Sequence, residues 1–334
     1  MSGPGTHPNR TFWWLIALLS GGYLTFLISL LLADCFFTTP QSILESVQSA
    51  EIRYAMKLTL ISCTLATILS LWIAVPMGYL LSRQKFFGKN LVEAIIDIPL
   101  VLPPLVIGLS LLIFFQTQPG KQLEWLARNR LGTIFIQLLI PAIIFFLMMM
   151  MRSPRTSNRR KTHAVIAALS VAVGLQVLPQ TDLAAQYLNR SLSTSITYAV
   201  PSIIIAQFAV SSAFAIRTMR VTFDQISKRE EEIAFTFGCT RFQAFWYIAL
   251  PRAKNGLATA AALAWARALG EFGPILIFAG ATRMRTEVLS TSVFLELSIG
   301  NIQAAIAIAL IMIFIAFLVL TFTRILGFRE NNIL

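Results

Sequence analysis

The chain has 334 residues, of which 56% are hydrophobic and 13% are charged, and its mean hydropathy is +0.72. This composition excludes a soluble globular domain and indicates an all-α protein with several transmembrane segments. The formal net charge is +12, but the Lys and Arg residues are scattered among short polar segments. Such scattering is typical of cytoplasmic loops and does not indicate nucleic-acid binding.

The residues that usually carry metal or catalytic chemistry are scarce. The chain contains three cysteines in separate segments and two histidines. They give neither a disulfide framework nor a metal site, so we expect no metal and no cofactor. The phosphate-binding pattern Gly-x-x-x-x-Gly-Lys-Ser/Thr does not occur in the sequence. No nucleophile–base arrangement stands out either, and we expect a protein without an enzymatic reaction of its own.

Residues 1–10 are polar and contain Pro and Gly, and we expect a disordered cytoplasmic tail. Thr11 to Ala33 form an uncharged apolar run that is long enough to cross a bilayer core of about 30 Å. A cleaved signal peptide is the alternative. The run is longer than a typical signal-peptide core, and Asp34 does not suit a small-residue cleavage site. We therefore assign residues 11–52 to a first transmembrane helix and an outer loop.

A second span is predicted over Leu58 to Ser82, and the third span is rich in helix-breaking residues: Pro99, Pro103, Pro104 and Gly108. Proline removes a backbone donor and displaces the preceding turn, so this third helix should be kinked or broken. Broken backbone at membrane depth is tolerated where it is buried in protein or lines a water-filled cavity. These four residues are therefore candidates for a translocation path or gate, with a packing kink as the alternative. Both spans belong to residues 53–118, the first part of the core.

Residues 119–194 are predicted to form an inserted helical hairpin. Residues 131–151 are apolar enough to span a membrane, whereas residues 164–179 are marginal. The two segments are joined by residues 152–161, of which five are basic. Their apolar flanks favour a cytoplasmic loop over a nucleic-acid-binding segment.

The second part of the core, residues 195–325, is predicted to contain the remaining spans. The segments in order are a span from Ile196 to Ile216, a charged loop at 217–254, a span from Asn255 to Ala281, an outer loop from Thr282 to Asn301, and a last span from Ile302 to Thr323. A cytoplasmic tail follows at 326–334. The whole chain thus reads as about eight transmembrane helices, a six-helix core plus the hairpin.

The distribution of Lys and Arg indicates the orientation in the membrane. With eight spans and both termini in the cytoplasm, the inner segments hold 18 of the 27 basic residues and the outer segments hold 8, while Arg267 lies within a span. A six-span arrangement with the insert on the outer surface gives 13 on each side. The bias therefore favours eight spans and a cytoplasmic position for the charged loop.

The charged loop contains two short helical patterns. We predict a helix from Glu232 to Phe237, a turn at Gly238, and a helix from Arg241 to Ile248 that is stopped by Pro251. Gly238 allows a sharp turn, because a residue without Cβ adopts a positive φ at little cost. Four aromatic side chains are expected to be exposed as an anchor for another protein: Phe242, Phe245, Trp246 and Tyr247. The alternative is an ordinary loop whose aromatics lie at the membrane interface.

The spacing Glu-x-Ala-x-x-x-Gly, nine residues, then Ile-x-Leu-Pro resembles the cytoplasmic loop signature of permease subunits of ATP-driven importers of the ABC class. Ile233 departs from the signature, where the family usually has a second Ala. The resemblance implies that the loop docks onto cytoplasmic ABC ATPase subunits, which hydrolyse ATP in place of this chain. The implied docking residues are Glu232, Ala234, Gly238, Phe242, Ile248, Leu250 and Pro251.

Arg267 and Glu271 are charged residues inside a predicted span. They lie four positions apart, so they share a helix face and can neutralise each other. One interpretation is that Arg267 assists the passage of an anion. The interpretation that we favour is an ion pair that fixes helix packing, since a permanent deep positive charge holds an anion rather than releasing it. Both residues are retained as candidates for the path.

The stretch from Ala266 to Leu289 is similar to molybdate and tungstate permeases, and sulfate and thiosulfate permeases share much of it. Residues 98–104 also resemble a stretch of oxyanion permeases. The resemblance covers residues 53–118 and 195–325. It implies a homodimer in the lipid bilayer of the cell (inner) membrane. It also implies an extracytoplasmic binding protein that delivers a tetrahedral oxyanion, with molybdate or tungstate favoured.

Other functions are open on the sequence. Sulfate, thiosulfate, phosphate-like anions and iron are alternative substrates of the same class of importer. A secondary anion transporter should show internal inverted repeats and intramembrane coupling residues, and we see no clear repeat and one Arg/Glu pair. A membrane-embedded enzyme needs a polar constellation within the spans, and none is visible in the sequence.

Overall fold

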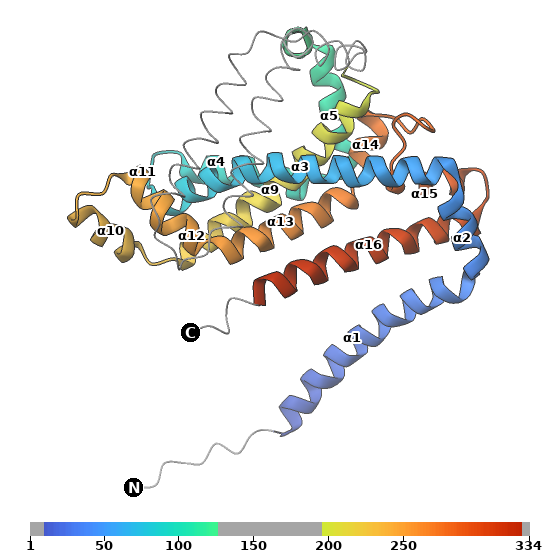
Figure 1. Cartoon of the computed structure of the whole chain (residues 1–334), viewed down its shortest axis with the longest axis horizontal. Coiled ribbons are helices and arrows are strands. Elements are labelled where there is room, and N and C mark those ends of the chain that lie inside the picture. Colours follow the sequence, from blue (N-terminus) through green and yellow to red (C-terminus); the bar gives the residue numbers. More distant parts are fainter. Residues whose placement is uncertain (1–9, 126–195, 329–334) are drawn as a thin grey trace, which may run out of the picture.

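The computed structural model describes residues 10–125 and 196–328, and every regular element in these parts is a helix (Figure 1). The first part comprises α1 (Arg10–Phe37), α2 (Pro40–Gln48), α3 (Ala50–Arg83), α4 (Lys89–Val101) and α5 (Pro104–Gln116). The second comprises α9 (Val200–Gln225), α10 (Lys228–Thr236), α11 (Arg241–Ala244), the π-helical η1 (Phe245–Ala249), α12 (Leu250–Arg252), α13 (Lys254–Leu269), α14 (Gly273–Phe278), α15 (Leu289–Ser298) and α16 (Ile302–Phe328). The predicted hairpin helices at 131–151 and 164–179 lie outside the described residues.

Four of the described helices are long and apolar enough to cross a membrane, namely α1, α3, α9 and α16. They coincide with four predicted spans, which are thereby confirmed as helices. α3 starts earlier than predicted because the Ser49 side chain accepts a hydrogen bond from the Ile52 N–H and caps the first turn. α4 and α5 together make a fifth candidate span, bent by 111°. The expected total of about eight spans stays a prediction.

The core is built around α3 and α9, and α13 packs against both (Figure 1). Small side chains let membrane helices approach closely, and the buried face of α3 carries a series of them: Ser62, Ala66, Ser70, Ala74 and Gly78. The hydroxyls of Ser70 and Ser211 lie 2.9 Å apart across the α3–α9 contact. α1, by contrast, has its apolar surface exposed and stands apart from the core in Figure 1.

The predicted span from 255 to 281 is not one continuous helix but two helices with a break between them. α13 ends at Leu269 and α14 begins at Gly273. Pro274 lies in the first turn of α14, where a missing N–H costs no bond. Inside a continuous helix the same proline would lose its bond to the carbonyl four residues earlier and clash with it. The break between α13 and α14 follows from this.

Side chains from other helices satisfy carbonyl groups at the α13–α14 break. The Gln207 Nε2 of α9 donates to the Ala268 carbonyl over 3.2 Å, and the Ser290 hydroxyl of α15 donates to the Glu271 carbonyl over 2.7 Å. The Ala268 carbonyl also accepts the Glu271 N–H over 3.3 Å. Unpaired carbonyls at membrane depth cost several kcal/mol, so these bonds stabilise the break. The break is therefore stabilised by specific contacts with neighbouring helices.

The predicted outer loop from 282 to 301 contains α15, which sequence analysis did not predict. Leu289, the first residue of α15, is fully buried, and its N–H donates to the Thr59 hydroxyl of α3 over 2.9 Å. A second short helix, α2, begins beside the Thr39 cap with Pro40 in its first turn. Both helices cover the same end of the core in Figure 1.

Gly78 is expected to be essential for the α3–α9 contact. A Cβ added there would lie 2.8 Å from the Arg220 backbone nitrogen, closer than backbone can yield without a shift of the helix. We expect Gly78→Ala to lower the free energy of unfolding by about 1–3 kcal/mol, as overpacking does. The matched control is Gly21→Ala on α1, where the added Cβ meets no atom within 4 Å.

The control should be neutral or stabilising by up to about 1 kcal/mol, because alanine is the better helix former. Thermal unfolding of both variants in detergent measures the difference. Equal melting temperatures for the two variants would contradict the close approach of α3 and α9 at Gly78.

Candidate functional site

The predicted docking loop forms a helix–turn–helix that projects from one end of the core (Figure 1). α10 begins at the cap residue Ser227, whose side chain accepts a backbone N–H of the first turn. At its other end, the Cys239 N–H donates to the Ala234 carbonyl over 3.1 Å and the Gly238 N–H donates to the Phe235 carbonyl over 3.0 Å. These two bonds are those of a Schellman motif, and Gly238 has the positive φ, +81°, that this motif requires. The predicted turn is confirmed.

The second arm of the loop does not end where sequence analysis placed its end. Thr240 and Gln243 form a capping box at the start of α11. A single π-helical turn follows, in which the Leu250 N–H donates to the Phe245 carbonyl. Pro251 follows this turn within α12, and the Ala253 N–H donates to the Ala249 carbonyl over 3.0 Å, so the helical backbone continues past the proline. The prediction that Pro251 stops the helix is therefore wrong.

The predicted anchor aromatics separate into two pairs. Phe242 and Tyr247 are exposed, as predicted. Phe245 and Trp246 are half-buried, so their predicted exposure is wrong. The Phe245 ring packs edge-on against Tyr79 of α3 with the ring centroids 4.7 Å apart, and Trp246 stacks on Phe242 at 5.9 Å. Half of the aromatic set thus attaches the loop to the core.

The exposed aromatics belong to a larger apolar surface. We define the docking face as five exposed side chains of the loop: Ile233, Phe235, Phe237, Phe242 and Tyr247. Phe237 is 83% exposed and Phe242 is 71% exposed, although both lie in a charged segment outside the candidate spans. Several exposed aromatic side chains in one loop indicate a surface that binds another protein.

The residues that the resemblance implied for docking occupy three environments. Glu232 and Gly238 are exposed, as is Phe242 of the docking face. Ile248 and Pro251 are half-buried. Two residues are buried in the packing of the loop, Ala234 and Leu250. The buried residues of the signature stabilise the packing of the loop, whereas its exposed residues are available for contact with another protein.

A buried cluster joins the loop to the core, and sequence analysis did not find it. We call Arg83, Tyr79 and Glu231 the Arg83 clamp. The Arg83 Nε donates to Glu231 Oε1 over 2.8 Å, and the Tyr79 hydroxyl donates to Glu231 Oε2 over 2.6 Å. The side chains of Arg83 and Glu231 are only 7% and 6% exposed. No sequence signal separates Glu231 from its neighbours Glu230 and Glu232.

The proline-rich segment is a true break. Pro99 lies inside α4, which ends at Val101, and Pro103 and Pro104 begin α5 at an angle of 111° to it. The predicted kink or break is thus a break, and its assignment to a gate stays a prediction. The residues around the break, from Val101 to Pro104, are exposed in the single chain.

The break in α4–α5 lies against α14, which follows the other break. A Cβ added at Gly108 would lie 2.7 Å from the Pro274 Cα. A Cβ added at Gly273 would lie 3.1 Å from the Leu105 backbone nitrogen. Only glycine allows this approach of two backbones. The structure thus brings two predicted path residues, Pro104 and Gly108, against Gly273 and Pro274 of α14.

Arg267 and Glu271 form the predicted ion pair. The Arg267 Nη2 lies 2.8 Å from Glu271 Oε1, and the Glu271 side chain is 1% exposed while that of Arg267 is 31% exposed. The guanidinium also lies 5.5 Å above the Phe214 ring. The buried carboxylate of Glu271 therefore needs its counter-charge from Arg267, whereas the guanidinium of Arg267 is also stabilised by solvent and by Phe214.

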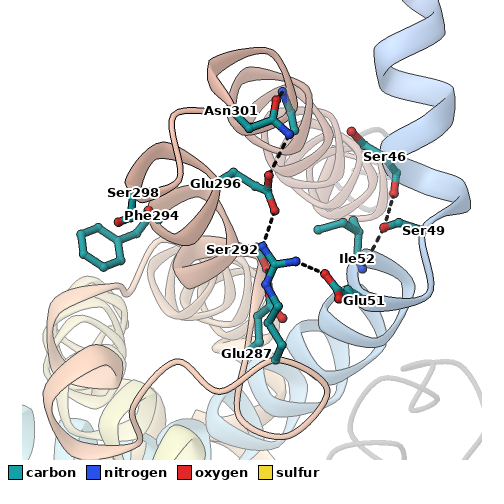
Figure 2. Close-up of polar contacts among 12 residues, drawn as sticks. Ser46, Ser49, Glu51, Ile52, Glu287, Ser292, Phe294, Glu296, Ser298 and Asn301 are labelled. Carbon is teal, nitrogen blue, oxygen red and sulfur yellow. Dashed lines mark hydrogen bonds and ion pairs between the residues drawn. The ribbon is translucent and has the colours of Figure 1, made fainter.

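A second charged cluster lies at the opposite end of α3, where Figure 2 shows Glu51 and Glu296 approaching from α3 and α15. Arg283 pairs with both carboxylates, with 2.7 Å between its Nη2 and Glu296 Oε1, and we call these residues the Arg283 clamp. The Asn301 amide donates to Glu296 over 3.0 Å. Burial raises the pKa of the neighbouring Glu287 carboxyl above its ordinary value, although a hydrogen bond from Ser292 opposes this.

The unequal burial of the Arg267–Glu271 pair predicts unequal effects of its two neutral variants. Arg267→Gln leaves a buried carboxylate without its counter-charge and should lower the free energy of unfolding by about 3 kcal/mol. Glu271→Gln leaves a partly exposed arginine that keeps its contact with Phe214, and should cost about 1 kcal/mol. The double variant should fall between the two. Thermal unfolding in detergent checks the order, and a larger loss for Glu271→Gln would contradict it.

The chain matches the profile of a protein family over residues 70–331. That family is described as "Binding-protein-dependent transport system inner membrane component". A chain in a crystal structure of a bacterial alginate ABC transporter, bound to its periplasmic protein, has a TM-score of 0.56 at 17% identity, covering 94% of this chain and 93% of that one. At this identity the likeness concerns the fold alone.

Several curated relatives are between a quarter and a third identical to the chain. The "Sulfate transport system permease protein CysT" of Escherichia coli (strain K12) is 26% identical over 83% of this chain and 76% of that protein. The "Molybdate/tungstate transport system permease protein WtpB" of Pyrococcus furiosus is 26% identical over 82% and 78%. The "Putative molybdenum transport system permease protein YvgM" of Bacillus subtilis (strain 168) is 28% identical over 84% and 96%.

The family profile covers more than half of the chain, and the described residues contain several helices of membrane-spanning length. The protein is therefore a multi-pass, non-catalytic component of the inner membrane, and it belongs to the family of inner membrane components of binding-protein-dependent transport systems.

Proposed function

We propose that this chain is the permease subunit of an ATP-driven importer of a tetrahedral oxyanion, and that molybdate or tungstate is its substrate. The observation that carries this proposal is the docking face, an exposed aromatic surface on a stiff helix–turn–helix in a chain without a phosphate-binding motif. Such a chain receives the work of ATP hydrolysis through contact with another subunit. A cytoplasmic ABC ATPase is the partner that fits the loop signature.

The translocation path is proposed to run along the two interrupted segments. Irregular backbone at membrane depth is tolerated beside protein or an aqueous cavity, and the α4–α5 break is exposed in the single chain. We infer that a second copy of the chain covers the break, so that two copies enclose the path between them. Pro99, Pro103, Pro104 and Gly108 then belong to the gate region.

Arg267 and Glu271 are assigned a structural role beside this path. Glu271 neutralises the guanidinium over 2.8 Å, which leaves little charge to hold an anion. Weak interaction along the path suits transport, because the substrate has to leave as well as enter. Selection among oxyanions is then a property of the extracytoplasmic binding protein that delivers the substrate.

Sulfate is the second candidate substrate. The relatives named as sulfate and as molybdate/tungstate permeases are equally similar to the chain at 26% identity. The stretch from 266 to 289 resembles molybdate and tungstate permeases more specifically, and it decides our preference. Both termini are expected in the cytoplasm, because this orientation puts most basic residues inside.

Elemental analysis of cells that express the chain with its native ATPase and binding protein tests the substrate. The cells are grown on nanomolar molybdate and tungstate with excess sulfate, and the reference cells lack the chain. We expect molybdenum or tungsten to accumulate, and Gly238→Pro to abolish the accumulation because proline cannot adopt the φ of +81°.

Gly88→Pro is the matched control, because Gly88 has a φ of +83° in a turn outside the docking loop. The control should retain uptake. Accumulation of labelled sulfate alone would move the assignment to sulfate, and unchanged uptake by Gly238→Pro would contradict coupling through this loop.

The docking face is tested by ATPase binding. Phe242→Glu places a charge on the docking face and should weaken binding by about 2 kcal/mol, the loss of one aromatic anchor. The control is Phe87→Glu, because Phe87 is also exposed but lies between α3 and α4. Co-purification of the native ATPase with each variant is the measurement. Equal recovery of the ATPase with both variants would exclude Phe242 from the interface.

A further inference from the structure

The Arg83 guanidinium is a junction of three elements. Besides its bond to Glu231 of α10, it donates from Nη1 to the Phe223 carbonyl over 2.9 Å and from Nη2 to the Ile226 carbonyl over 3.0 Å. These carbonyls stand at the end of α9, where helical carbonyl groups lack partners within the helix. A planar guanidinium reaches three acceptors in fixed directions, which a lysine ammonium does not reproduce. Arg83 thus fixes α3, α9 and α10 relative to one another.

Tyr79 extends the same junction to the second arm of the loop. It lies one turn before Arg83 on α3, and its hydroxyl donates to Glu231. Its ring packs against Phe245 of η1 at 4.7 Å and against Phe223 of α9 at 5.4 Å. Both arms of the docking loop therefore contact a single turn of α3.

Two of the elements joined by the clamp, α3 and α9, also pack closely against each other, and α13 packs closely against α9. A Cβ added at Gly78 would meet the backbone of α9 at 2.8 Å, and one added at Gly256 of α13 would meet the Thr222 side chain of α9 at 2.1 Å. Closely packed helices move together, since interiors transmit strain. The docking loop is thus attached to a stiff unit of three helices.

α4 is held to this unit in a different way. Its Asp97 and Glu93 pair with Arg217 and Arg220 of α9 over 3.8 and 3.0 Å. The side chains of Arg217 and Asp97 are 65% and 43% exposed, and exposed pairs of this kind contribute little energy. The Arg217–Asp97 pair therefore fixes the position of α4 on α9 less firmly than the buried Arg83 bonds fix α3 on α9.

α3 also reaches the far end of the core. It has 34 residues, which corresponds to about 50 Å, and its first turn carries Glu51 of the Arg283 clamp. One helix thus connects the docking loop with the cluster that ties α3 to α15. A displacement imposed at Arg83 has a continuous route to the opposite face.

We propose that Arg83 is the positioning residue for energy coupling in this transporter. It makes the docking loop move as one body with α3 and α9, so that ATP-driven movement of the loop reaches the opposite end of α3. This inference rests on the proposed function, because it takes the loop to be the contact with the ATPase. Tyr79 and Glu231 complete the junction.

The test uses the complete complex with its native ATPase and binding protein in proteoliposomes, and it measures oxyanion delivered per ATP hydrolysed. We expect Arg83→Lys to lower this ratio about tenfold, which corresponds to about one lost charge-assisted hydrogen bond, while ATP hydrolysis and ATPase binding persist. Tyr79→Phe keeps the ring contacts, loses one hydrogen bond, and should lower the ratio less. The Tyr79 variant also keeps the test decisive if Arg83→Lys does not fold.

Arg252→Gln is the matched control, because Arg252 pairs with Glu230 over 3.1 Å within the same loop but is 65% exposed. The control should keep the ratio of the unchanged protein. A merely structural role of Arg83 would reduce hydrolysis and uptake together and leave the ratio unchanged. An unchanged ratio in both Arg83→Lys and Tyr79→Phe would overturn the proposal.

A second readout separates this inference from the substrate assignment. A spin label on Gln48→Cys, in α2 at the far end of α3, reports ATP-dependent movement without any oxyanion, after the native cysteines are replaced by serine. We expect an ATP-dependent change of label mobility that Arg83→Lys abolishes and Arg252→Gln retains. If the complex shows this pattern but transports no oxyanion, only the substrate assignment is overturned. A change that survives Arg83→Lys would overturn the role of Arg83.

Discussion

Inside a bilayer every backbone N–H and C=O group needs a partner within the protein, and this constraint decides how the helices are arranged. α3 and α9 satisfy most of it by themselves as long helices, although Pro76 inside α3 removes one donor, and they form the centre of the core. The segments α4–α5 and α13–α14 are interrupted, and neighbouring side chains bond to the second, such as Ser290, which donates to the Glu271 carbonyl. The two interrupted segments also lie against each other, because Gly108 and Gly273 let their backbones approach.

The described part of the molecule therefore consists of two kinds of element with different stiffness. α3, α9 and α13 are locked by small residues, of which Gly78 is the tightest against backbone atoms. α4 is attached through partly buried apolar side chains such as Val92 and Ile96 and through ion pairs, of which Arg217–Asp97 is exposed and would be screened by high salt. A transporter that alternates between two states needs both kinds, one to carry displacement and one to change its contacts.

The sequence predicts this fold as far as local signals reach. The length of the apolar runs alone predicts α1, α3, α9 and α16. Gly238 predicts the turn in the docking loop, because glycine readily adopts the positive φ that the turn requires. The break before Pro274 was missed because the apolar run continues across it. The role of Glu231 could not be predicted from the sequence, because it lies between two other glutamates, Glu230 and Glu232. Only the fold shows that Glu231 is the one that pairs with Arg83, which lies 148 positions earlier in the chain. The burial of Phe245 likewise depends on Tyr79 of a distant helix.

A buried ion pair is a poor way to gain stability, since desolvation offsets most of the attraction, and apolar side chains would hold α10 against α3 equally well. What Arg83 adds is a set of hydrogen bonds with fixed directions. Its bonds to Glu231, Phe223 and Ile226 define one relative position of three elements, whereas an apolar contact tolerates sliding. The docking face has the opposite character, because its exposed aromatics suit a partner that binds through packing. The loop thus meets its proposed partner through an apolar surface and transmits the movement inward through a polar joint that fixes orientation.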